Sequence, residues 1–358
     1  MGRYLMLDVG AGTLDILYYN TEKDLHYKAV VRSPVRVLAE QIKQTKGNLL
    51  ITGGEMGGGP VSQVLIERAA THEVVMTKAS AATIHHNRKR VLAKGIRVVE
   101  EDEAEALKGD ARFQCFRTKD IQPERLRQIV TGFGVPFDFD AVAICAQDHG
   151  VAPTGVSHLD FRHRMFTQVL DRTPSPQALL YEAEKVPEVM NRLRAIGSDA
   201  LLLPTKRIYV MDSGMAAILG ASMDTLVRDL EKIIVLDIAT SHTVAAAIED
   251  GTLCGFFEYH TKDVTVDRMD RLLADLAEGN LSHDKILKEG GHGAYIRHAF
   301  GLDQVERILA TGPRRKLITG SSKTIFLGAP WGDNMMTGTV GLMEAVRLRE
   351  GLPPISYL

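Results

Sequence analysis

One short segment near the start of the chain combines residue types that could hold a metal-bound phosphate. It reads Asp8-Val9-Gly10-Ala11-Gly12-Thr13-Leu14-Asp15 and follows an apolar run. A carboxylate at a strand end can hold Mg2+ directly or through water, and glycines let backbone N–H groups approach phosphate oxygens. The Thr13 hydroxyl can add a further donor. The pattern predicts a metal–triphosphate site, and the structural alternative is a tight hairpin in which Asp8 and Asp15 cap backbone amides.

Asp212 is a second candidate, because it follows the predicted strand Arg207–Met211 and precedes Ser213-Gly214. At a strand end that faces a cleft, its carboxylate could act as a general base for a hydroxyl group or water. It could instead cap the helix that starts after it, by accepting the amide of Gly214 or Met215. Both roles stay open at this point.

Histidines and cysteines give weaker signals. His85, His86, His158 and His163 are typical of surface or capping groups, and no role is assigned to His149, His242, His260 or His292. The three cysteines, Cys115, Cys145 and Cys254, are too far apart for a zinc ribbon or a closely spaced iron–sulfur motif. They also exclude a disulfide framework and are typical of a reducing compartment.

The elements that must position these residues alternate between strands and helices. The strand Tyr4–Val9 is repeated at Ile233–Ile238, with Asp237 at the position of Asp8, and each copy continues into a small-residue turn and a second strand. This indicates an internal duplication in which one unit opens each of two domains. An apolar run over Phe139–Ala146, typical of a buried strand, ends in Gln147-Asp148. Helices are expected over Pro34–Lys46, Pro60–Ala70, Ala79–His86, Pro123–Thr131 and Pro176–Ile196.

Composition excludes several classes of function. The chain has 358 residues, and 43 basic against 45 acidic side chains leave a net charge of −2. This balance gives no reason to expect a nucleic acid or an anionic membrane as partner. No apolar run approaches the roughly 18 residues of a membrane span, and Asp8 interrupts the N-terminal apolar stretch that a signal peptide would need. We therefore expect a cytoplasmic protein.

Several motifs, in order along the chain, resemble those of the superfamily that unites acetate and sugar kinases, heat-shock ATPases and actin. Asp8–Asp15 resembles its first phosphate loop, and the repeat at Asp237 falls where the second lies. Asp212–Ala221 is similar to the helix before the second loop, Leu317–Ser322 to the adenosine loop, and Gly338–Ala345 to the closing helix. The resemblance implies two α/β domains of the ribonuclease-H-like type, each with a mixed five-stranded sheet, and ATP with Mg2+ in the cleft between them.

The resemblance also implies roles for individual residues. Asp8 and Asp237 would position Mg2+, and Asp212 would be the base, with Gln147 and Asp148 orienting the acceptor. The nucleotide-binding residues would be Gly10, Gly12, Thr13, Asp15, Thr240, Thr243, Gly320 and Ser321. The domains would be residues 1–222, with an inserted segment near 88–120, and residues 223–358, whose last helix would pack back on the first domain. The implied function is an ATP-dependent phosphotransferase or ATPase that acts on a small molecule.

Two departures from the pattern keep other functions open. Ala239 and Ser241 stand where the resembled second loop has glycines, and Ser321 replaces a glycine of the adenosine loop. These residues narrow the backbone conformations available near a phosphate. The alternatives are an ATP-gated switch or assembly protein with slow or no hydrolysis, and a protein that binds nucleotide without turnover.

A narrower resemblance covers segments spread along the chain. They are Gly53–Pro60, Gln147–Gly150, Glu258–Thr261 and Ala329–Asp333. They are similar to an uncharacterised family of archaea and anaerobic bacteria whose members sometimes carry the label pyruvate formate-lyase activating enzyme. A radical enzyme of that kind needs three closely spaced cysteines to hold its cluster. The spacing of Cys115, Cys145 and Cys254 predicts that this chain is not such an enzyme.

Overall fold

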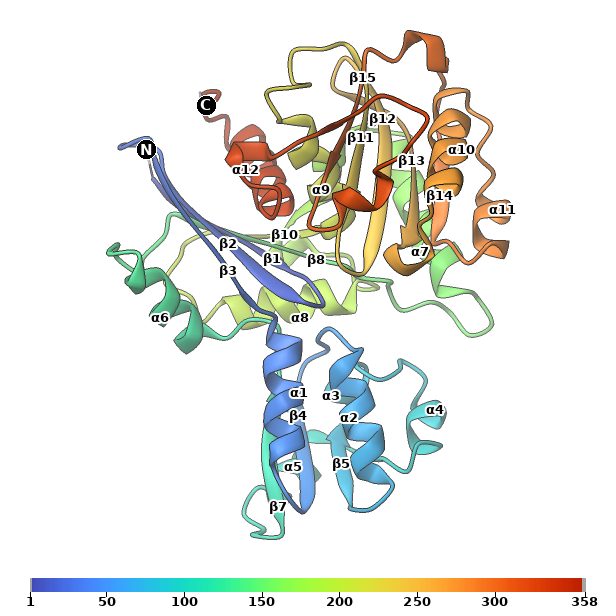
Figure 1. Cartoon of the computed structure of the whole chain (residues 1–358). Helices are drawn as coiled ribbons and strands as arrows, with labels where there is room; N and C mark the ends of the chain where they lie inside the picture. Colours follow the sequence, from blue (N-terminus) through green and yellow to red (C-terminus); the bar gives the residue numbers. More distant parts are fainter. Residues whose placement is uncertain (1, 356–358) are drawn as a thin grey trace.

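The computed structural model of the chain describes residues 2–355, which form three β-sheets (Figure 1). The first sheet has the order β3-β2-β1-β8-β10-β9. Its strands are β1 (Arg3–Val9), β2 (Thr13–Asn20), β3 (Leu25–Arg32), β8 (Ala141–Ala146), β9 (Leu180–Glu182) and β10 (Ile208–Asp212). Strands β1, β2 and β3 are antiparallel neighbours, whereas β8 and β10 run parallel to β1. Apart from β9 at the edge, this is the order of a ribonuclease-H-like sheet.

The second sheet repeats this arrangement in the order β14-β13-β12-β11-β15-β16. Its strands are β11 (Lys232–Ile238), β12 (His242–Glu249), β13 (Thr252–His260), β14 (Gly293–Ile296), β15 (Arg307–Thr311) and β16 (Ile325–Leu327). Here too β11, β12 and β13 are antiparallel neighbours, and β15 and β16 run parallel to β11. The expected fold class, two ribonuclease-H-like units, is therefore confirmed by the sheet order of the chain itself.

The expectation of five strands in each sheet was wrong, because each sheet has a sixth strand at one edge. Strand β9 lies within Pro176–Ile196, where a single helix was expected. That segment instead contains two short 3-10 turns around β9, and α8 (Asn191–Ala200) begins only later. Pro187 interrupts the segment and has no N–H for a helical hydrogen bond. In the second sheet, β14 adds to the edge of β13.

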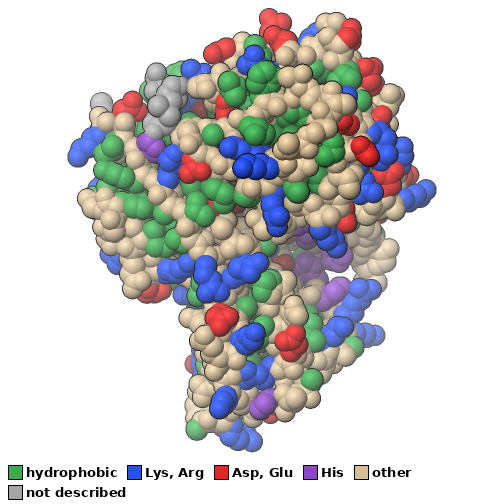
Figure 2. Space-filling view, in the orientation of Figure 1, with side chains coloured by type: hydrophobic (Ala, Val, Ile, Leu, Met, Phe, Trp, Pro, Cys, Tyr) green, Lys and Arg blue, Asp and Glu red, His purple; other side chains and the backbone are tan. Residues whose placement is uncertain are grey.

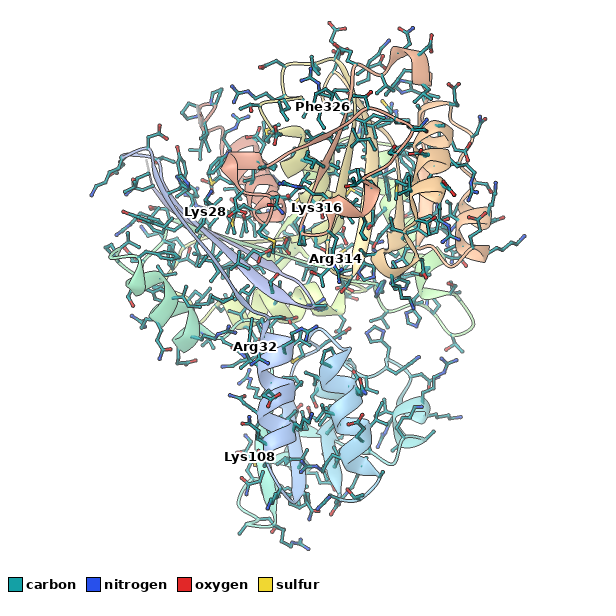
Figure 3. The ribbon with its side chains drawn as sticks, viewed as in Figure 1. Lys28, Arg32, Lys108, Arg314, Lys316 and Phe326 are labelled. Carbon is teal, nitrogen blue, oxygen red and sulfur yellow. The ribbon has the colours of Figure 1, made fainter. Side chains whose placement is uncertain are left out.

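A third, all-parallel sheet forms a separate small lobe, residues 34–118, at the bottom of Figure 1. Its strands are β4 (Asn48–Gly53), β5 (Val74–Thr77), β6 (Arg97–Val99) and β7 (Phe113–Thr118), and its helices are α1 (Pro34–Gln44), α2 (Pro60–Ala69), α3 (Lys78–Ala81), α4 (Arg88–Leu92) and α5 (Glu101–Leu107). The segment expected as an insertion near 88–120 contributes only part of this lobe. Arg32, at the end of β3, lies where the chain passes from the first sheet into the lobe (Figure 3).

The remaining helices cover the two larger sheets. They are α6 (Pro123–Gly132), α7 (His158–Leu170), α9 (Ser213–Ser222), α10 (Val266–Ala277), α11 (His283–Lys288) and α12 (Thr337–Glu350). Helix α9 contacts strands of both sheets, and α12 packs on α9, β1 and β8. A Cβ atom at Gly220 of α9 would overlap the carbonyl oxygen of Thr337, and one at Gly341 of α12 would overlap that of Ala216. The two helices therefore cross with their backbones in contact.

Within residues 2–355, no helix combines the length and apolarity that a membrane span requires.

Candidate functional site

A cavity of about 690 Å3 lies where the two larger sheets and the small lobe meet. We call it the central cavity. Its wall contains the β1–β2 turn, the β11–β12 turn, the residues after β4 and β8, the end of β13 and the start of α12. Figure 2 shows histidine side chains gathered in the hollow where the small lobe joins the rest of the molecule. The cavity is thus built from all three units of the fold.

The two duplicated turns meet at one end of this cavity. Each turn is closed by the same kind of backbone hydrogen bond, from the Gly10 amide to the Thr13 carbonyl at 3.0 Å and from the Ala239 amide to the His242 carbonyl at 3.1 Å. A Cβ atom at Gly12 would lie 3.5 Å from Cγ2 of Thr240, so the turns are in close proximity. The internal repeat seen in the sequence therefore becomes a pair of facing loops.

Three aspartates form the carboxylate end of the cavity, namely Asp8, Asp15 and Asp237. Asp8 and Asp15 are register partners on β1 and β2, and Asp237 accepts a hydrogen bond from the Thr311 hydroxyl at 3.3 Å. Burial raises the pKa of Asp8 to about 6 and that of Asp237 to about 7. Burial, together with the charge of Asp8, raises the pKa of Asp15 to about 8. The charged forms of these side chains are costly without a cation.

Asp212 lies at a strand end as expected, but its carboxylate is buried and does not line the cavity. One oxygen accepts the amides of Gly214 and Met215, at 3.0 and 3.2 Å, and so caps α9. The other accepts from the Arg162 guanidinium at 2.9 Å. A carboxylate with both oxygens held in this way is poorly placed to take a proton from a substrate. These contacts are those of a helix cap, and the role of general base stays a prediction.

Arg162 extends this contact to the second sheet. Its other terminal nitrogen donates to Glu258 of β13 at 2.6 Å, and all three side chains are at most about 5% exposed. Gln147 donates to the second oxygen of Glu258 at 2.6 Å. Burial acts to raise the pKa of Glu258, but Arg162 and His292 outweigh it and hold that pKa well below its usual range. Glu258 is therefore an ionised group in the cavity wall.

Asp148 also lines the cavity, although its oxygens are used to hold the chain. They accept the amides of Gly150 and Leu193 at 2.8 and 2.9 Å, which ties the turn after β8 to α8. Gln147 is in contact with Glu258 rather than with Asp212. These two residues therefore lie where an acceptor molecule could contact them, but they do not surround the expected base.

Three of the residues expected to bind nucleotide lie outside the cavity lining. Thr243 is fully buried in β12, and its hydroxyl lies 3.0 Å from that of Thr261. Gly320 and Ser321 also fall outside the lining. The Ser321 hydroxyl is bonded to Asp270 of α10. For these three residues, nucleotide binding stays a prediction. The cavity does contain the other expected ligands, which are Gly10, Gly12, Thr13, Asp15 and Thr240.

Four histidines form a cluster in the cavity wall that begins at the end of the β11–β12 turn. His149, His242, His260 and His292, which we call the histidine cluster, all line it. Burial lowers the pKa of His149 to about 3 and that of His242 to about 4. Sequence reasoning gave these residues no role, because they are far apart along the chain. The one available signal was that three of them lie at or just beyond the ends of strands.

The small lobe supplies the third wall. Glu55 accepts hydrogen bonds from His86 at 2.9 Å and from Asn191 of α8 at 2.6 Å. The glycine-rich stretch Met56–Gly59 follows it and lines the cavity. Arg192 pairs with Asp120 at 2.8 Å and donates to the Gln147 carbonyl, which joins the lobe to the first sheet. No pattern in the sequence indicated that these groups line the same cavity as the aspartates.

A family model described as "Putative pyruvate format-lyase activating enzyme (DUF1786)" matches residues 56–317, nearly three quarters of the chain. The chain belongs to this family. The match confirms the narrower resemblance inferred from the sequence. No curated protein matches the chain.

Solved structures that align with nearly the whole chain include kinases and an activator protein. A protein of Listeria monocytogenes described as "a putative N-acetylmannosamine kinase" is 10% identical over 97% of this chain and 99% of its own, with a TM-score of 0.36. The activator of 2-hydroxyisocaproyl-CoA dehydratase from Clostridium difficile, with bound ADPNP, is 9% identical over 99% of both chains, with a TM-score of 0.34. The ROK hexokinase of Thermus thermophilus is 10% identical over 98% and 100%, with a TM-score of 0.33.

Proposed function

We propose that the chain binds Mg2+ and ATP at the carboxylate end of the central cavity. The observation that carries this proposal is the convergence of the two duplicated turns, which brings Gly12 within contact distance of Thr240. Backbone amides from both turns would then surround one polyphosphate. In this proposal the two domains, divided after residue 222, close on the nucleotide from opposite sides.

The donor groups fit a magnesium ion. Mg2+ prefers carboxylate oxygens and water, and Asp8 and Asp237 present carboxylates from equivalent strands of the repeat. One oxygen of Asp15 is buried without a hydrogen-bond partner among the described residues. A bound cation would offset the cost of three buried carboxylates at this end. When present, the ion would draw charge from the phosphate oxygens.

We further propose a phosphotransferase or ATPase whose acceptor is a small polar molecule or water. The cavity extends from the aspartates to Gln147, Glu55 and His86, which a nucleotide held by the turns leaves available. These side chains offer both hydrogen-bond donors and acceptors for orienting an acceptor. Because the Asp212 carboxylate caps α9 and binds Arg162, we assign it the positioning of Arg162 and no proton transfer.

The alternative is an ATP-gated switch with slow or no hydrolysis. One contact favours it, namely the pairing of Arg162 with Asp212 of the first sheet and Glu258 of the second. A movement of one sheet relative to the other would have to break a buried charged hydrogen bond. Such a contact has two discrete states, which is what a switch requires.

Calorimetry with Mg2+-ATP and Mg2+-ADP, followed by turnover assays with and without a metabolite library, tests the proposal. We expect Asp8→Asn and Asp237→Asn to weaken nucleotide binding at least about tenfold, which corresponds to about 1.4 kcal/mol. The matched control is Asp270→Asn, an aspartate of the second domain outside the cavity lining. Absence of binding by the wild type at millimolar nucleotide would overturn the proposal. Binding without turnover under any condition would favour the switch.

A further inference from the structure

Three members of the histidine cluster bring their ring nitrogens into one small volume. One nitrogen from each of His242, His260 and His292 lies within 4.8 Å of the others. The Nε2 atoms of His260 and His292 are 3.0 Å apart. In a tetrahedral zinc site with bonds of about 2.0–2.1 Å, ligand nitrogens are separated by about 3.3 Å. Small side-chain rotations would therefore suffice to place three nitrogens around one ion.

The second sheet fixes this arrangement through its pairing. His242 begins β12 and His260 ends β13, and the two are register partners across the antiparallel ladder. The backbone amide of His292 donates to the Glu258 carbonyl at 2.8 Å, which holds the residue before β14 beside the same strand end. Two of the three imidazoles thus project from paired strand ends, and the third from a residue that a backbone hydrogen bond holds to β13. Sites built on such elements hold their ligands more precisely than sites on loops.

The surroundings of the rings also fit metal ligation. Nε2 of His242 is buried and has no hydrogen-bond partner among residues 2–355. Nδ1 of His292 is buried and lies 3.3 Å from the Glu258 carboxylate without a hydrogen bond to it, while its Nε2 faces His260. Histidine ligands commonly direct the other ring nitrogen toward a carboxylate, which orients the ring. Glu258, itself oriented by Arg162 and Gln147, is in position to do this.

We infer that His242, His260 and His292 bind a divalent transition metal ion of the Zn2+ class, with Glu258 orienting His292. All three ligands line the central cavity, so a fourth coordination position faces it. That position can take water, hydroxide or an oxygen or nitrogen atom of a small molecule. Three imidazoles suit Zn2+ and its neighbours, whereas carboxylates suit Mg2+. The site is therefore chemically distinct from the carboxylate end, and the inference does not depend on nucleotide binding.

A second set of potential ligands, Glu249, Cys254 and His298, lies at the other end of the β12–β13 hairpin. There Nε2 of His298 is already bonded to the Glu249 carboxylate at 2.6 Å, and both side chains are partly exposed. Cys254 lies 3.7 Å from the same nitrogen. This set lies outside the cavity lining, and a variant of it serves as the control for variants of the histidine cluster.

The test is a titration of the chelator-treated full chain with Co2+ and then Zn2+, followed by visible absorption and elemental analysis. We expect one equivalent of Co2+, displaced by Zn2+, with no thiolate charge-transfer band. His242→Ala and His260→Ala should each weaken binding by at least about 100-fold, and Glu258→Gln by about 10- to 100-fold. His298→Ala, in the second set of potential ligands outside the cavity lining, should bind as the wild type does.

Three results would overturn the inference. They are no stoichiometric binding by the wild type, unchanged binding in both histidine variants, and loss of binding in His298→Ala with a thiolate band in the wild type. Circular dichroism of each variant verifies that it is folded. Because His260 is only partly buried, His260→Asn provides a second variant that keeps a polar side chain at the strand end.

Discussion

Arg162 donates to Glu258 at 2.6 Å while its second terminal nitrogen donates to Asp212 at 2.9 Å. The two carboxylates belong to different sheets, so one guanidinium joins the two halves of the protein behind the cavity wall. Its planar geometry suits this task, because each nitrogen can address a separate carboxylate. This contact, the hydrogen bond from Gln147 to Glu258 and the duplicated turns link the two larger sheets at the candidate site.

Removing this arginine should strongly destabilise the fold. In Arg162→Ala two buried carboxylates lose their partner, and breaking a buried pair in this way costs about 3–5 kcal/mol. Urea unfolding measures the change. The control is Arg112→Ala, which removes a solvent-exposed pair with Asp110 and should change the stability little. Equal losses in the two variants would show that the buried contact has no special weight.

The Asp212→Asn variant distinguishes a helix cap from a general base. Asparagine caps a helix as well as aspartate does, so nucleotide binding should remain. Stability should fall, because the amide cannot accept the buried hydrogen bond from Arg162 with its second atom while it caps α9. Turnover, if wild-type protein shows it, should change by less than about tenfold, whereas loss of a general base lowers it by about 10²–10⁴-fold. Parallel measurements of turnover and nucleotide affinity decide between the two. A selective collapse of turnover would restore Asp212 as the base.

Stability of the metal-free protein should fall with rising pH because of Asp15. Burial and Asp8 raise the pKa of Asp15 to about 8, so the folded state holds the proton more tightly than the unfolded state does. This contribution is complete below about pH 4 and is lost toward about pH 8, with a slope of at most about 1.4 kcal/mol per pH unit. Urea unfolding of Asp15→Asn across that range should show a flatter profile. The exposed Glu22→Gln should leave the slope unchanged.

Enlarging Gly341 should disrupt the crossing of α9 and α12. A Cβ atom there would overlap the Ala216 carbonyl oxygen, and backbone cannot move aside as a side chain can. We expect Gly341→Ala to cost roughly 3 kcal/mol or to prevent folding. Gly132, which has open space around it at the end of α6, is the matched helical control, and Gly132→Ala should be neutral or slightly stabilising. Thermal unfolding compares them, and similar melting temperatures would contradict the close crossing.

Reconstitution with iron and sulfide should yield no four-iron cluster and no cleavage of S-adenosylmethionine. Cys115, Cys145 and Cys254 lie on β7, β8 and β13, in three different sheets, and only Cys115 is exposed. Three thiolates on such strands cannot ligate one cluster without large rearrangement. Electron paramagnetic resonance and iron analysis provide the measurement. A stable cluster that is lost in Cys115→Ala would support the activity named in the family description.

The sequence by itself determined the features that depend on local pattern. The apolar runs that end in Asp8 and Asp237 defined two equivalent strands, and Asp250-Gly251 marked the turn between β12 and β13. The repeat predicted an internal duplication that opens each of two domains, and the resemblance of the ordered motifs to the kinase, heat-shock ATPase and actin superfamily implied their ribonuclease-H-like type. Such patterns are visible because hydrophobic periodicity and turn residues report on their own neighbours in the chain.

Tertiary structure alone decided what surrounds the aspartates. Pairing of β12 with β13 brought His242, His260 and the neighbouring His292 together at one end of these strands, and the packing of α7 placed Arg162 between Asp212 and Glu258. That placement pairs the Asp212 carboxylate with a buried guanidinium, which the position of Asp212 at a strand end could not reveal. The small lobe added the third wall of the cavity. These contacts join residues far apart in the chain, and their energies depend on burial and on the distance between charges, neither of which is set by the order of neighbouring residues.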